Sequence, residues 1–173
     1  VIGTAYADGG AGTSNTVFGK TAGDSMDAGA NYNSFFGDGA GTANTGSDDN
    51  TAVGYQALAS NVGGWSNTAV GSSSLTANTT GVNQSAFGYQ ALKSATSGGS
   101  NTAFGYRAGR QISTGTFNVL VGANALDAGN GSYNVAVGYQ ALMANTAGQL
   151  VAVGHNALKA NTSGVQNTSV GFE

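Results

Sequence analysis

One nine-residue unit recurs along the chain, and its phase hardly changes. The clearest copy is Asn-Thr-Ala-Val-Gly-Tyr-Gln-Ala-Leu at residues 50–58. The glycine of the unit falls every 16 to 18 residues, at Gly3, Gly19, Gly37, Gly54, Gly71, Gly88, Gly105, Gly122, Gly138, Gly154 and Gly171. A phase held this closely indicates stacked structural repeats and not a disordered low-complexity chain. The chain is therefore predicted to be a solenoid.

Within each unit the side chains alternate in character, as they do along a β-strand. Two residues before the glycine stands a small side chain such as Ala52, and directly before it stands Val or Phe, as at Val53. Alternate residues of a strand point to opposite faces. Turn-forming stretches rich in Asn, Thr and Gly separate the units. We expect each coil to hold a strand through Asn-Thr-Ala-Val-Gly, a bend at the glycine, a second short strand through the Ala-Leu segment, and a polar return turn.

These patterns predict an all-β fold, a repetitive parallel β-roll of about ten 17-residue coils. Coils stacked about 4.8 Å apart would make a rod on the order of 50 Å long. Residues 1–49 are interpreted as irregular N-terminal repeats of one continuous domain, and residues 50–173 as its regular repeats. We expect this domain to belong to a longer fibre.

An asparagine column is predicted to stack as a hydrogen-bonding ladder, at Asn15, Asn33, Asn50, Asn67, Asn101, Asn118, Asn134 and Asn167.

Composition excludes several classes of protein. Only 8% of the residues are charged, against about 25% in an ordinary globular protein, which is too few for the solvated faces of a helical bundle. The chain has no cysteine, so neither a disulfide framework nor a cysteine zinc site is possible. With five basic residues and a net charge of −3, nucleic-acid binding is not expected. No apolar run is long enough for a transmembrane helix, so membrane insertion is not expected.

The Val/Phe column is the strongest candidate for an interface. A narrow roll lined by alanine buries little surface, whereas ordering the backbone is costly. If the column faces outward, it forms an apolar stripe along the rod, and such stripes mark interaction surfaces. The expected subunit interface comprises Val53, Val70, Phe87, Phe104, Val121, Val137 and Val153. The alternative, with Val and Phe filling the roll and alanine outside, is the less favoured arrangement.

Units of the form Asn-[Thr/Ser]-x-[Val/Phe]-Gly-x-x-Ala-Leu resemble the head repeats of trimeric autotransporter adhesins. They are still more similar to repeats of bacteriophage tail fibres and related surface fibres that carry a self-cleaving chaperone. The resemblance covers residues 50–171 well and residues 1–49 loosely, and the adhesin unit is shorter. It implies a left-handed parallel β-roll or β-helix, a homotrimer, and a structural or adhesive role outside the cell, on a cell surface or on a virion.

Aromatic side chains are the candidate ligand contacts. Tyrosine follows the glycine in several units, at Tyr55, Tyr89, Tyr106 and Tyr139, and a single tryptophan, Trp65, stands in a return turn. Such rings could pack against the sugars of a cell-surface glycan or receptor. The alternative, which we favour for the tyrosines, is an aromatic ladder between adjacent coils that serves stability alone.

Catalytic and metal-binding patterns are weak. His155 stands in the tyrosine column and is interpreted as a surface variant of it. Asp48 and Asp49 are a poor pair for glycoside hydrolysis, because neighbouring residues of an extended chain point to opposite faces. Asp24 and Asp27, or residues 46–50, offer oxygen ligands for Ca²⁺, but neither segment has the spacing of known calcium loops, and solvated turn residues are the favoured interpretation. No cofactor and no enzymatic activity are expected.

The sequence therefore favours a non-enzymatic structural or adhesive fibre segment, a rigid trimeric rod that forms or presents a receptor-contacting surface. Two alternatives remain open. One is a subunit of an extracellular filament that stacks end to end, and the other is a carbohydrate-binding adhesin module.

Overall fold

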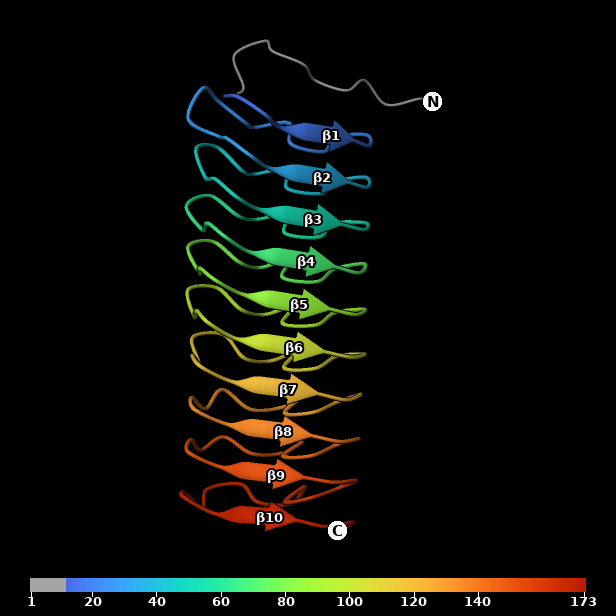
Figure 1. The fold of residues 1–173 in the computed structure, drawn as a ribbon, viewed down its shortest axis with the longest axis vertical. Helices are drawn as coiled ribbons and strands as arrows, with labels where there is room; N and C mark the ends of the chain where they lie inside the picture. Colours follow the sequence, from blue (N-terminus) through green and yellow to red (C-terminus); the bar gives the residue numbers. More distant parts are fainter. Residues whose placement is uncertain (1–11) are drawn as a thin grey trace.

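The computed structural model describes residues 12–173, which form an all-β solenoid. Ten three-residue strands make one parallel sheet, in which each strand pairs with the next along the chain (Figure 1). The strands are β1 (Thr16–Phe18), β2 (Ser34–Phe36), β3 (Thr51–Val53), β4 (Thr68–Val70), β5 (Ser85–Phe87), β6 (Thr102–Phe104), β7 (Val119–Val121), β8 (Val135–Val137), β9 (Val151–Val153) and β10 (Thr168–Val170). The predicted fold class is confirmed; Gly3, the first glycine of the repeat, lies outside the described residues.

The strands pair strictly in register, so equivalent residues stack into columns. Val53 lies beside Val70, and Phe87 lies beside Phe104. The same register relates every neighbouring pair from β1 to β10, although successive coils differ in length by a residue or two. The return turns absorb those differences, and each side-chain column therefore runs the length of the rod.

Small side chains fill the interior, as the alanine pattern predicts. The middle residue of each strand points inward, and Ala52, Ala69 and Ala86 are fully buried. A leucine four residues after the glycine, such as Leu58, is also fully buried. Methyl groups and leucine side chains thus supply most of the apolar core, because the narrow coil is closely packed.

Two coils carry a large residue in the alanine column, and a glycine makes room for each. Phe35 replaces the alanine in β2, and Gly41 stands in the leucine column of the same coil, where an added Cβ atom would lie 2.5 Å from the Phe35 ring. Leu120 replaces the alanine in β7, and a Cβ atom at Gly109 would lie 2.6 Å from it. The compensating glycine lies in the same coil for Phe35 and in the preceding coil for Leu120, whose own coil keeps Leu126.

The repeat glycine is required at the corner that follows each strand. Gly54 has a φ of +131°, and an added Cβ atom would lie 2.7 Å from the carbonyl carbon of Gly71 in the next coil. Gly71 and Gly88 are related in the same way. Both the backbone conformation and the close approach of neighbouring coils exclude a larger side chain.

The expected second strand through the Ala-Leu segment is not formed, and that part of the prediction is wrong. Residues 55–60 form tight turns, because Gln56 and Leu58 both have positive φ values, of 52° and 54°. Their amides point in opposite directions along the rod: Gln56 donates to the carbonyl oxygen of Asp38 in the preceding coil, and Leu58 donates to that of Ser74 in the following coil. The segment is thus hydrogen-bonded to both neighbours without being extended.

The predicted asparagine ladder is present and buried from Asn33 to Asn134, whereas Asn167, beyond Leu150 in the same column, is exposed. The Asn33 side-chain oxygen accepts from the backbone amide of Asn50 at 2.9 Å, and the Asn50 oxygen accepts from that of Asn67 at 3.0 Å. The Asn50 side-chain amide donates across the coil to the carbonyl oxygen of Gly64 at 2.9 Å. Each asparagine therefore joins two coils and also holds the return turn of its own coil, which satisfies groups that would otherwise be buried without partners.

A second asparagine ladder, which the sequence reasoning missed, runs beside the first. Asn61 donates to the side-chain oxygen of Asn44 at 2.9 Å, and Asn78 donates to that of Asn61 at 2.8 Å. The Asn61 side-chain amide also donates to the carbonyl oxygen of Gly64 at 2.7 Å, so Asn50 and Asn61 are both hydrogen-bonded to the same return turn.

Replacement of Asn67 by alanine is expected to lower the free energy of unfolding by about 2–4 kcal/mol. The change removes the hydrogen bonds that the Asn67 side-chain amide donates to the Asn50 side-chain oxygen and to the Gly81 carbonyl oxygen, and it leaves the buried Gln84 backbone amide without its acceptor. Asn167→Ala is the matched control, because Asn167 occupies the same column but is exposed in the final coil. Urea titrations of both variants should show a large loss only for Asn67→Ala, and equal losses would contradict the buried ladder.

Phe35 and Gly41 are expected to behave as one packing unit. Phe35→Ala should cost about 3–5 kcal/mol by opening a cavity, and Gly41→Leu should be destabilising because the leucine would overlap the Phe35 ring. The double variant recreates the Ala52 and Leu58 pairing of the next coil, so it should recover much of the free energy of unfolding that each single change removes. A double-mutant cycle should therefore give a coupling free energy above about 1 kcal/mol. Additive losses would show that the two sites are independent.

Candidate functional site

The outward face of the sheet carries the Val/Phe column. Phe104 is 55% exposed, Val121 40% and Val53 37%, and the other predicted interface residues, Val70, Phe87, Val137 and Val153, are partly exposed. The outward orientation is confirmed, and the alternative with alanine outside is wrong, because the alanines fill the core. Whether the column forms a subunit interface remains a prediction.

No charged side chain projects from the outward sheet face. Each strand presents its first and third residues outward, and in β1–β10 these are only Thr, Ser, Val or Phe. Phe87 and Phe104 stack on this face, with ring centroids 4.9 Å apart. The described part of the rod therefore has one long side that is flat, uncharged and largely apolar.

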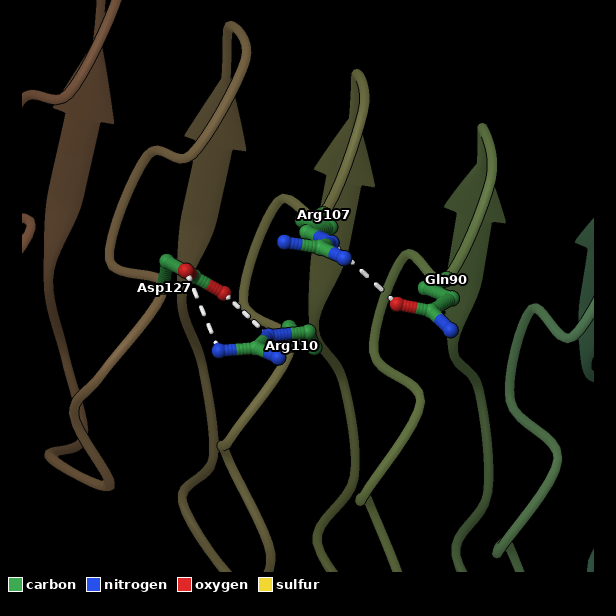
Figure 2. Close-up of polar contacts among 4 residues, drawn as sticks. All are labelled: Gln90, Arg107, Arg110 and Asp127. Carbon is green, nitrogen blue, oxygen red and sulfur yellow. Dashed lines mark hydrogen bonds and ion pairs between the residues drawn. The ribbon is translucent and has the colours of Figure 1, made fainter.

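Charged residues that join neighbouring coils lie in the turns after the strands (Figure 2). The Arg107 guanidinium donates to the side-chain oxygen of Gln90 at 3.2 Å. Arg110 donates to Asp127, with a shortest nitrogen–oxygen distance of 2.7 Å, and the two side chains are 29% and 14% exposed. These contacts support coil stacking only modestly, and they leave the sheet face free of charge.

The predicted tyrosine column forms the corner beside the sheet face. Tyr55, Tyr89, Tyr106 and Tyr139 are about half exposed. Tyr89 and Tyr106 stack at 5.6 Å, and Tyr139 stacks on His155 at 5.1 Å. The aromatic ladder is therefore present where neighbouring coils both carry a ring, and one face of each of these rings is already covered.

His155 occupies the tyrosine column as an exposed aromatic residue. Its ring lies between those of Tyr139 and Phe172, at centroid distances of 5.1 and 4.8 Å. The interpretation of His155 as a surface variant of the column is confirmed by its position.

Trp65 lies in a different place, on a surface hollow formed by the return turns. The hollow is lined by Asp27, Asp48, Asp49, Val62 and Trp65, together with the backbone between them. These residues come from three successive coils, and Trp65 is 50% exposed. The structure thus separates Trp65 from the tyrosines with which it was grouped and brings it together with three carboxylates, a juxtaposition that spacing alone did not reveal.

Two of these carboxylates also support the turns. Asp48 Oδ1 accepts from the backbone amide of Asn31 at 2.7 Å, and Asp27 Oδ1 accepts from the amide of Gly29 at 2.8 Å. Within residues 12–173, no group of three or more His, Cys, Asp or Glu side chains is arranged to hold a metal ion. The segments weighed for Ca²⁺, Asp24 with Asp27 and residues 46–50, contribute turn residues and part of this hollow.

No protein-family model, no curated protein and no solved structure matches the chain. Among the described residues there is also no helix long and apolar enough to cross a membrane. The surfaces of the rod are therefore the basis for a functional proposal.

Proposed function

We propose that the chain is a non-enzymatic structural rod, a segment of a phage tail fibre or of an extracellular surface appendage. Its role is to hold or form a receptor-contacting surface at a fixed distance. Copies of the rod associate side by side through the outward sheet face as a homotrimer. The trimer and the location outside the cell follow from the resemblance of the repeat units to fibre and adhesin heads.

The observation that carries this proposal is the uncharged outward face of β1–β10. Water contact with apolar surface costs about 25 cal/mol per Å², and a stripe of this kind marks an interaction surface. Side chains such as Phe104 and Val121 have no place left in the alanine-lined interior, so they can be buried only by another molecule.

The face is also large enough for stable association. Nine spacings of about 4.8 Å give a length of about 43 Å. The columns that flank the strands include Lys20, Asp38 and Asp49 at the N-terminal end of the rod. With these columns, five to six residues at about 3.3 Å each give a width of roughly 15–20 Å. The footprint is then roughly 650–850 Å² per partner, close to the roughly 800 Å² that a standard interface buries on each side.

Sedimentation equilibrium tests the proposal. The purified chain should sediment as a discrete trimer, and Phe104→Asp should shift it toward monomer by placing an unpaired carboxylate in the interface. Thr80→Asp, an exposed turn position away from the sheet face, is the matched control and should leave the assembly unchanged. A stable wild-type monomer would contradict the proposal, and concentration-dependent threads in negative-stain images would favour the end-to-end filament instead.

Saccharide binding is a second candidate function, and the Trp65 hollow favours it. An indole face can pack against the C–H face of a sugar ring, while carboxylates accept hydrogen bonds from its hydroxyl groups. Asp27, Asp48 and Asp49 line the same hollow as Trp65, and each has carboxylate oxygens beyond those that accept hydrogen bonds from the turns. The stacked tyrosines offer fewer free ring faces.

Trp65→Ala is expected to abolish binding to any sugar that the wild-type chain retains on a glycan array. Tyr89→Ala is the matched control and should bind normally, because it removes an exposed aromatic ring from the other corner of the rod. Calorimetric titration with the sugar that binds best on the array would measure the affinity of both variants. A blank array for the wild type, or unchanged affinity after Trp65→Ala, would exclude this candidate.

A further inference from the structure

The outward sheet face is most apolar over three neighbouring strands, β7, β8 and β9. The first outward position of each strand is Thr or Ser in β1–β6 and in β10, but valine in β7–β9. The third position is also valine in these strands. We call the resulting set of side chains the valine patch; it consists of Val119, Val121, Val135, Val137, Val151 and Val153.

Aromatic pairs flank the valine patch on both sides. Phe117 and Tyr133 precede β7 and β8 and stack at 5.3 Å, with exposures of 55% and 58%. Tyr139 and His155 follow β8 and β9 and stack at 5.1 Å. Exposed aromatic rings therefore border the patch at both ends of its strands.

We infer that the valine patch is the anchor of self-association, where it packs against the valine patches of the other copies of this chain in the proposed trimer. This inference rests on the proposed function and assigns the energetic centre of its interface. A few central residues carry most of the binding energy in typical interfaces. Valine is suited to this role because its side chain has little rotamer freedom to lose.

The spacing of the columns identifies a second copy as the occupant. Side chains on the face repeat at the coil spacing of about 4.8 Å. A second copy has the same spacing and register, so its valines can fit between these along the whole face, as identical side chains do between paired sheets. When the rods lie parallel, placing patch against patch also overlaps the rods over their full length.

A polar ligand would find no partner on the valine patch. The strand amides are already bonded to the next coil: Val119 donates to the carbonyl oxygen of Asn134 and Val135 to that of Leu150, each at 2.8 Å. The valine side chains offer no hydrogen-bonding group. An apolar surface of matching shape is therefore the partner that the patch fits.

The triple variant Val119→Thr, Val135→Thr and Val151→Thr tests the inference. Threonine already occupies this column in β3, β4 and β6, so the fold should be kept. Sedimentation equilibrium should show the association constant lowered by about tenfold or more. The matched control is Thr51→Ser, Thr68→Ser and Thr102→Ser, which alters the same column elsewhere and should change association by less than about twofold.

Cross-linking gives an independent readout that a folding defect would not mimic. The chain has no cysteine, so Val135→Cys introduces a single thiol at the centre of the patch. A bis-maleimide linker that spans the sheet separation of about 10 Å should join two copies, whereas Thr80→Cys should give little product.

The two proposals can fail separately. The wild-type chain could associate while the valine triple variant keeps the same association constant and Val135→Cys gives no cross-linked product. That result would overturn the valine patch as anchor and leave self-association in place. A wild-type chain that stays monomeric would overturn both.

Discussion

In-register stacking of short coils is the constraint on which the rest of this structure depends. Each coil has only three residues of strand, so most of its backbone polar groups lie in turns, where amides such as those of Gln56 and Leu58 bond to carbonyl oxygens of neighbouring coils. The asparagine side chains supply further partners: Asn50 and Asn61 both donate to the carbonyl oxygen of Gly64, and each also bonds to the equivalent asparagine of a neighbouring coil. Because buried polar groups need such partners, the coils cannot slide or change register freely.

The narrow interior that follows from this stacking determines what the surface looks like. Once alanine and leucine fill the coil, valine and phenylalanine in the strands can only face outward, and the glycine corners bring tyrosine and histidine beside them. The few charged side chains lie in the turns, as Arg110 and Asp127 do. A stiff rod with one long apolar side is suited to building a fibre with its own copies, and the single tryptophan, on another side, is free for a different contact.

The sequence predicts the columns well and the turns poorly. The phase of the glycines and the Ala/Val alternation were enough for the parallel solenoid, the inward alanines and the ladder through Asn50, because all of these repeat in nearly every unit. The second ladder was missed, since alanine and isoleucine replace asparagine at Ala95 and Ile112. A positive φ at Leu58 could not be foreseen, because leucine seldom adopts that conformation. The hollow at Trp65 depends on how return turns of unequal length pack together, which residue spacing does not specify.

Hydrogen exchange at the asparagine side-chain amides, followed by NMR, tests the stacking most directly. These protons exchange within the folded protein only when the coils that cover them separate. The Nδ2 protons of Asn50 and Asn67 should exchange slowly and at rates close to each other, whereas those of the exposed Asn167 should exchange quickly. Exchange at Asn50 and Asn67 as fast as at Asn167 would show that the asparagines do not hold the coils together.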